Sequence, residues 1–347
     1  MKITITKEEL KNVAAEGIIS DEQADNLWTH FYEINQGKAG FTGSNVLYYF
    51  GALIVISAMT WFATEAFAKY NALGLFAVGI LYFSGLFFFG NNLYYKKRTE
   101  IPGGLLLTSA VFMVPLIIYS IQEYFKIWGY EAPGNYKDFY ILVRSGWFML
   151  ETVTIIVSIL FLMKYDFTFL TFPLAFSLWF LSIDITPIIF THDQLSWQQR
   201  EIVSLYFGLF ILLFAYLIDR KTQKDYAFWL YLFGMICFWG GLSLMDSNSE
   251  LNKFLYLCVN LFLMVISVLF NRRVFIVFGV LGVYGYLYHL SSIVFRDSLM
   301  FPFILSLIGI FIIWLGIKYN KNKESIDGFI NSKIPDKIFK LLPPGRI

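Results

Sequence analysis

Two carboxylates set within apolar stretches are the residues of this chain best placed to do chemistry. Glu151 and Asp184 lie in consecutive apolar stretches, and an ionised carboxylate at a membrane centre costs roughly 2.5–3.5 kcal/mol. If the two stretches form antiparallel helices, both residues come to a similar depth near one membrane face. As a pair they would hold a proton or a cation, because two adjacent carboxylates cannot both ionise cheaply. The alternative is that each lies at headgroup level, with Arg144 or Arg200 as a structural counter-ion.

A second polar group follows the first in the sequence. His192-Asp193 comes shortly after Asp184, and Arg200-Glu201 opens the next apolar stretch. Such a cluster could serve a membrane-embedded transferase acting on a lipid-linked substrate, with His192 as general acid or base. The alternative is an ordinary polar loop. We find no His-x₃-His spacing, nucleophile elbow, Walker loop or Gly-x-Gly-x-x-Gly, so we assign no catalytic residue, metal or cofactor.

His289 is the other candidate, in the run Tyr284-Gly-Tyr-Leu-Tyr-His289. A histidine inside an apolar stretch could join Glu151 and Asp184 in an ion or substrate site. The alternative is that it is bonded to a neighbouring tyrosine or a backbone carbonyl. Both interpretations stay open at this point.

Composition predicts the kind of elements that must position these residues. Hydrophobic residues make up 57% and charged residues 15% of the 347 residues, and the mean hydropathy is +0.60. These values are typical of an all-α polytopic membrane protein, and the long apolar runs lack the alternation of membrane strands. The lipid bilayer is therefore an expected partner. The net charge of +2 gives no reason to expect nucleic-acid binding.

Apolar segments of bilayer length recur along residues 44–317, which we predict to be the transmembrane domain. About ten membrane helices are expected there. Their predicted spans are 44–64, 70–93, 103–121, 145–163, 167–190, 199–218, 226–245, 252–270, 274–293 and 299–317.

Two motifs suggest that this domain is an internal repeat. Val46-x-x-Tyr-Phe-Gly51 recurs as Val203-x-x-Tyr-Phe-Gly208, and the Leu-x-Phe-Pro-x-x-x-Ser-Leu pattern at 170–178 recurs at 299–307. Five helices in each repeat would give the two repeats opposite orientations in the membrane. This is a known transporter design in which the substrate binds between the repeats. The alternative is chance similarity, because phenylalanine and leucine are abundant here. The predicted repeats are 44–190 and 199–317.

Residues 1–43 are predicted to form a cytoplasmic helical hairpin. Capping boxes at Thr6-Lys-Glu-Glu9 and Ser20-Asp-Glu-Gln23 each indicate a helix start, and Gly17 is placed to end the first helix. Its apolar face includes Leu10, Val13, Leu27, Trp28 and Phe31. Two short helices are too small to be stable alone, so we expect residues 6–34 to bind a second copy or another protein.

The start of the chain resembles a known family. The motif Ala14-Ala-Glu-Gly-Ile-Ile-Ser-Asp-Glu-Gln-Ala24, followed by a first membrane helix ending in Thr60-Trp61, is similar to the bacterial membrane proteins of domain of unknown function 2157. The resemblance covers about residues 6–62. It implies a bacterial membrane protein of unknown function, and it brings no substrate or functional residue.

The basic residues predict the orientation of the chain. With the N-terminus inside, 20 of the 27 Lys and Arg residues fall on the inner side, so both termini should be cytoplasmic. We therefore expect a multi-pass protein of the bacterial inner membrane. Residues 318–347 form the predicted cytoplasmic tail, with a basic amphipathic segment that includes Lys333, Lys337 and Lys340.

Three functions are compatible with these features. A transporter or permease for a small solute agrees best with the helix number, the repeat and the Glu151/Asp184 pair. A non-catalytic scaffold or sensor, binding partners through the hairpin, agrees with the lack of catalytic motifs. A membrane-embedded transferase would use the cluster around His192, although the sequence favours no enzymatic activity.

Overall fold

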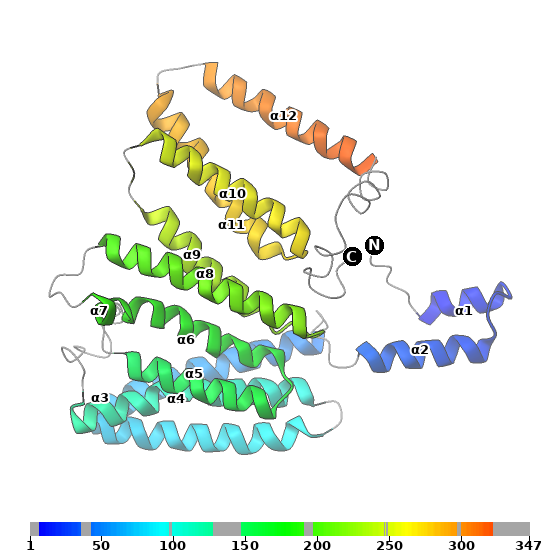
Figure 1. Cartoon of the computed structure of the whole chain (residues 1–347). Helices are drawn as coiled ribbons and strands as arrows, with labels where there is room; N and C mark the ends of the chain where they lie inside the picture. The colour runs from blue at the N-terminus through cyan, green and yellow to red at the C-terminus, as the bar shows by residue number, and fades with distance from the viewer. Residues whose placement is uncertain are drawn as a thin grey trace. The chain divides into compact units, whose positions relative to one another are not determined.

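The computed structural model describes residues 7–35, 43–96, 99–127, 147–190, 197–245, 247, 249–296 and 300–321. Over these ranges all regular structure is helical (Figure 1). Five helices in this part of the chain are long and apolar enough to cross a membrane. They are Ala68–Tyr94, Glu100–Phe125, Trp197–Lys221, Glu250–Phe270 and Arg273–Val294. The expected class, a helical membrane protein, agrees with these findings.

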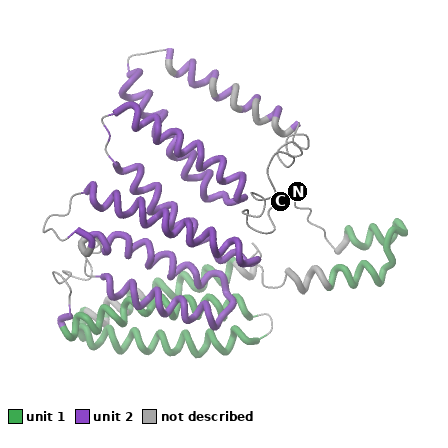
Figure 2. Tube along the Cα trace, in the orientation of Figure 1, with its two compact units in different colours: residues 1–125 green, residues 126–347 purple. Residues whose placement is uncertain are grey.

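The chain divides into two compact units, Met1–Phe125 and Lys126–Ile347 (Figure 2). This boundary differs from the one between the predicted repeats, which falls between residues 190 and 199. The second unit therefore contains the helices that carry Glu151 and Asp184 together with all the helices that follow.

The first unit begins with the helical hairpin. Helices α1 (Lys7–Ala15) and α2 (Asp21–Asn35) contact each other. The second capping box is confirmed, because the Ser20 N–H donates to Gln23 Oε1 at 2.9 Å and the Gln23 N–H donates to Ser20 Oγ at 3.1 Å. Gly17 has φ +77°, as predicted for a left-handed helix end. Thr6, which opens the first capping box, lies outside the described residues.

Helix α3 (Gly43–Tyr94) contains two of the predicted membrane helices. Its backbone leaves the helical region at Asn71, with φ 57° and ψ −149°. The rings of Phe62 and Tyr82 come within 6.1 Å of each other, although about 30 Å of straight helix would separate them. The two halves of α3 therefore fold back on one another at Asn71.

The second half of α3 packs closely on α4 (Glu100–Phe125) through glycines. A Cβ atom on Gly103 would lie 2.4 Å from the Tyr94 nitrogen, and one on Gly90 would lie 3.0 Å from the Leu107 nitrogen. The small residues let the two backbones approach, as is common between membrane helices.

In the second unit, α5 and α6 form an antiparallel pair. Helix α5 covers Phe148–Lys164, the 3₁₀ turn Thr168–Leu170 follows, and α6 covers Thr171–Asp184. The predicted helix 167–190 is shorter than expected, because the regular helix stops at Asp184 and α7 (Thr186–Ile189) follows as a separate turn. Pro173 lies in the first turn of α6, where its missing N–H leaves no helical bond unmade.

The remaining helices continue the second unit. They are α8 (Trp197–Lys221), α9 (Phe228–Leu244), α10 (Glu250–Phe270), α11 (Arg273–His289) with the π-helical turn Leu290–Val294, and α12 (Met300–Lys321). Helix α8 packs on α9, and α10 packs on α11. Helix α6 contacts α5, α8 and α9, so it occupies a central place in this unit.

An aromatic core holds α6 against α9. Phe172 and Trp229 have ring centroids 4.5 Å apart, and Phe176 and Trp179 each lie 5.7 Å from Phe233. Cys237 is a free, buried thiol in the same core, which agrees with a packing role. This aromatic packing holds α6 against α9 from Phe172 to Trp179.

Candidate functional site: a buried carboxylate pair

Asp184 is anchored at the point where α5 begins. Its Oδ2 accepts the backbone N–H of Trp147 at 2.9 Å, and the Trp147 carbonyl accepts the backbone N–H of Glu151 at 3.1 Å. Because α5 and α6 are antiparallel, the last residue of α6 reaches the first turn of α5. The positive end of the α5 dipole also favours a carboxylate here. Asp184 is 3% exposed, so its side chain is buried in the protein interior.

Glu151 lies one turn into α5 and is 6% exposed. Both of its carboxylate oxygens are buried and accept no hydrogen bond from the part of the chain that the structure describes. The Glu151 N–H donates to the Trp147 carbonyl and the Trp147 N–H donates to Asp184, so both acidic residues lie at the first turn of α5. A buried carboxylate with no donor is costly when ionised, so Glu151 differs sharply from Asp184.

Arg200 is a described cation whose charge acts on Asp184. It lies in the first turn of α8, with its guanidinium carbon 5.8 Å from the centre of the Trp197 ring. The half-buried Glu201 follows it. The other predicted members of this polar group, Arg144, His192 and Asp193, lie outside the described residues.

A buried polar stripe continues from Glu151 along α5. Thr154 and Ser158 are both buried, and each donates its hydroxyl to the carbonyl four residues earlier. Residues 151, 154 and 158 share one helix face and span about 10 Å along the axis. Helical spacing in the sequence could have revealed this stripe, but the sequence analysis did not single it out.

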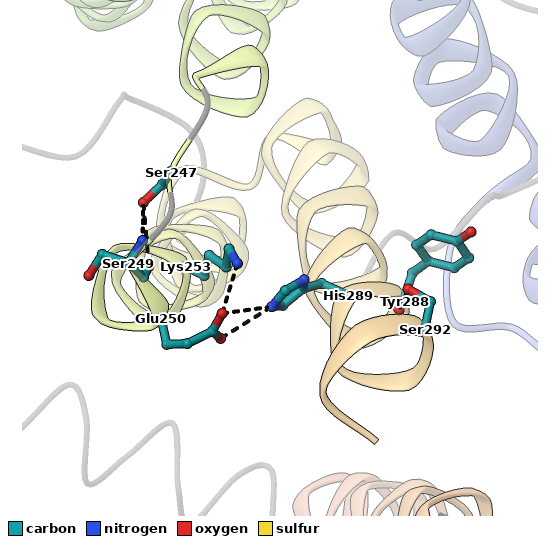
Figure 3. A network of polar contacts seen from close by, with 7 residues as sticks. All are labelled: Ser247, Ser249, Glu250, Lys253, Tyr288, His289 and Ser292. Atoms are coloured by element: carbon teal, nitrogen blue, oxygen red, sulfur yellow. Dashed lines mark hydrogen bonds and ion pairs between the residues drawn. The ribbon is translucent and has the colours of Figure 1, made fainter. Parts of the chain in front are cut away.

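His289 is placed elsewhere in the unit. Its Nε2 lies 3.2 Å from Glu250 Oε2, and Lys253 Nζ donates to the same carboxylate at 2.8 Å (Figure 3). Figure 3 shows His289 and Glu250 pointing toward one another from α11 and α10, while Tyr288 points away. The structure thus pairs His289 with a carboxylate and does not join it to Glu151 and Asp184. The tyrosine or carbonyl partner that we considered is not the one observed.

A second ionic cluster joins the opposite ends of these helices, and the sequence analysis did not identify it. Arg272, in the turn between α10 and α11, donates to Asp219 through Nε at 3.2 Å and Nη2 at 2.6 Å. Its Nη1 pairs with Asp225 at 2.5 Å. Burial works to lower the pKa of the Arg272 guanidinium, but these two carboxylates raise it above its ordinary value.

Asp166 extends this cluster to the turn between α5 and α6. It accepts hydrogen bonds from Lys224 and from the Tyr226 hydroxyl, and these bonds lower the pKa of the Asp166 carboxyl below its usual value. In the sequence, Arg272 and Lys224 count only among the basic residues that predict orientation. Nothing in their spacing identified the carboxylates that they meet.

Comparison with known proteins does not identify a relative. No family model matches the chain, and neither a curated protein nor a solved structure matches it.

Proposed function

We propose that this chain is a transporter or permease-like protein of the bacterial inner membrane that moves a small solute, with Glu151 and Asp184 as its proton or cation site. The observation that carries this proposal is the buried Glu151 carboxylate, which has no donor among the described residues and shares the first turn of α5 with a second carboxylate. Such an arrangement is costly in a membrane helix and is typical of residues on an ion pathway.

The two carboxylates have different tasks in this proposal. Asp184 accepts the backbone N–H of Trp147 and is attracted by the positive charge of Arg200, and both interactions stabilise its ionised form. Glu151 has neither form of support and holds the proton. When Glu151 releases the proton, the ionised form must gain water or a cationic group. The start of α5 must then move, and this movement links ion release to a change of conformation.

The inverted repeat remains part of this proposal. Both Val-x-x-Tyr-Phe-Gly motifs lie in the first member of a folded-back helix pair, namely the two halves of α3 and the α8–α9 pair. The two glycines have different surroundings. A Cβ atom at Gly208 would lie 2.3 Å from the Phe238 nitrogen of α9, whereas one at Gly51 would meet nothing within 4 Å. The fold-back therefore supports the repeat, while close packing at the glycine of the motif is a feature of one half.

A scaffold or sensor is the second candidate. The aromatic packing between α6 and α9 forms a solid core in the second unit, which suits a protein that does not open. The hairpin exposes Ile18 and Leu27, and these side chains suit a protein partner or a second copy. A transferase around His192 remains a third hypothesis, on residues outside the described part.

The test uses purified full-length protein in proteoliposomes. We expect pH-gradient-driven currents with at least one member of a panel of amino acids, sugars and organic cations. Asp184→Asn and Glu151→Gln should each abolish these currents, because neither can exchange a proton, and both variants should remain monodisperse. Glu100→Gln, at the exposed start of α4, serves as the matched control. Currents that survive in both pair variants, or a wild type silent across the panel, would favour the scaffold.

The orientation is part of the proposal and has its own test. Single cysteines at Asn92, Asn135 and Asn248 are introduced after Cys237 and Cys258 have been replaced by alanine. In intact cells an impermeant thiol reagent should label positions 135 and 248 and leave position 92 unlabelled, because basic residues favour an N-in, C-in topology. The reverse pattern would contradict it.

A further inference from the structure

An apolar groove of about 450 Å³ lies over α6 in the second unit. Thr171, Leu174 and Leu178 of α6 line its floor. Its walls are the face of α5 between Ile155 and Met163 and the face of α8 between Phe210 and Ile218. Helix α6 contacts both α5 and α8 and is shorter than either of them. The groove is the space that α6 leaves between these two longer helices.

The groove offers hydrocarbon alone to a ligand. Only two of its lining residues carry hydroxyls, and both hydroxyls are bonded away from it. Thr171 donates to the Thr168 carbonyl at 2.7 Å, and Tyr226 donates to Asp166. A polar solute would lose its hydrogen bonds with water on entering and gain none, so the groove does not suit the cargo of a carrier.

One end of the groove is basic. Its lining on α8 ends at Ile218, and Arg220 and Lys221 follow after the buried Asp219. Its lining on α5 ends at Met163, directly before Lys164. Over residues 164–166, 219–226 and 271–273 there are six basic residues and three acidic ones, and Arg272 pairs with two of those acids. Exposed positive charge therefore gathers where the helices leave the apolar layer.

We infer that this groove binds one acyl chain of an anionic phospholipid, with the headgroup at the basic end. The nine residues of α8 from Phe210 to Ile218, eight helical rises of 1.5 Å, give the groove a length of about 12 Å, which lies within one leaflet of a bilayer. Lysine and arginine near a membrane surface attract anionic headgroups. The groove is thus apolar at the depth of acyl chains and basic at the depth of phosphates.

The experiment reconstitutes the full chain in vesicles of equal parts palmitoyl-oleoyl phosphatidylglycerol and palmitoyl-oleoyl phosphatidylcholine. After detergent extraction, native mass spectrometry counts the lipids that stay bound. Because the two lipids carry the same chains, any preference reports the headgroup. We expect phosphatidylglycerol in clear excess on the wild type.

Ile159→Trp should fill the groove and lower the bound phosphatidylglycerol about tenfold, which corresponds to about 1.4 kcal/mol. Its matched control is Ile156→Trp on the same helix, since Ile156 is 52% exposed and does not line the groove while Ile159 is 44% exposed and does. Met163→Trp provides a second filling variant if the first is poorly folded. Equal retention by both filling variants and the control would overturn the inference.

The headgroup is tested by charge removal. Lys221→Gln should lower the preference for phosphatidylglycerol over phosphatidylcholine about fivefold, as expected for one basic residue at a membrane surface. Lys69→Gln, on an exposed residue of the first unit, should leave the preference unchanged. Equal binding of the two lipids to the wild type would refute an anionic headgroup and with it this site.

Discussion

Arg272→Met is expected to lower the free energy of unfolding in detergent micelles by about 3–5 kcal/mol, the range found when one partner of a buried ion pair is removed. The Arg272 side chain is 7% exposed and that of Asp219 is 2% exposed. Removing the guanidinium would leave the Asp219 carboxylate buried without its two bonds. The substitution would also remove the ion pair with Asp225. It would remove the packing of the guanidinium on the Tyr231 ring, in which the Arg272 Cζ lies 5.5 Å from the ring centroid.

The neighbouring Arg273 supplies the matched control. It is also basic, but it is exposed at the first position of α11, so Arg273→Met should change stability by less than 0.5 kcal/mol or so. The double variant Arg272→Met with Asp219→Leu should recover part of the loss, because it leaves no buried charge unpaired. Thermal or denaturant unfolding of the purified protein measures all three. Equal stability of the two single variants would contradict a buried pair.

Gly208→Ala is expected to destabilise the α8–α9 pair by about 1–3 kcal/mol, as overpacking in a close-packed interior does. A Cβ atom at Gly208 would lie 2.3 Å from the Phe238 nitrogen and 2.7 Å from its Cα. Backbone atoms cannot rotate away as a flexible side chain can, so the helices must separate. Gly241 makes the reciprocal contact, where a Cβ atom would lie 2.6 Å from the Glu201 carbonyl oxygen.

Gly240→Ala, on the partner helix α9, is the control, because a Cβ atom there meets nothing within 4 Å. It should be neutral or slightly stabilising, since alanine favours the helix over glycine by about 0.5–1 kcal/mol. Denaturant unfolding in micelles compares the two variants. If Gly208→Ala proved as well tolerated as Gly240→Ala, the close approach of α8 and α9 would be wrong.

The local features of the fold could be predicted from the sequence. The capping box at Ser20 and Gln23 and the left-handed Gly17 depend on residues within a few positions of one another, and both are confirmed. The two helices at 44–64 and 70–93 were also expected as separate segments, and the backbone at Asn71 separates them. The end of α6 was missed, because the predicted helix 167–190 was extended across Asp184 and Pro187, although a proline one to three residues past a helix is a typical stop signal.

The candidate site was predicted in part. An antiparallel pair of helices placed Glu151 and Asp184 at one depth, and the structure places both at the first turn of α5. The sequence analysis did not identify the backbone N–H of Trp147 as the group that holds Asp184, since every residue but proline has such a donor. His289 was grouped with Glu151 and Asp184, but in the structure it lies beside Glu250. The predicted depth of a residue in the membrane does not identify the helix that packs next to it.

Hydropathy by itself determined which segments are apolar enough to cross a membrane, because transfer into lipid depends on the local composition of each segment, and five described helices have that length and composition. Only the tertiary structure decided which charges are paired and which are left without a donor. Arg272 meets Asp219 across 53 residues, and Asp184 meets Trp147 across 37. Such pairings depend on which helices pack together, and many helix arrangements bury the same apolar surface equally well. The sequence therefore predicts the segments, and packing selects the partners.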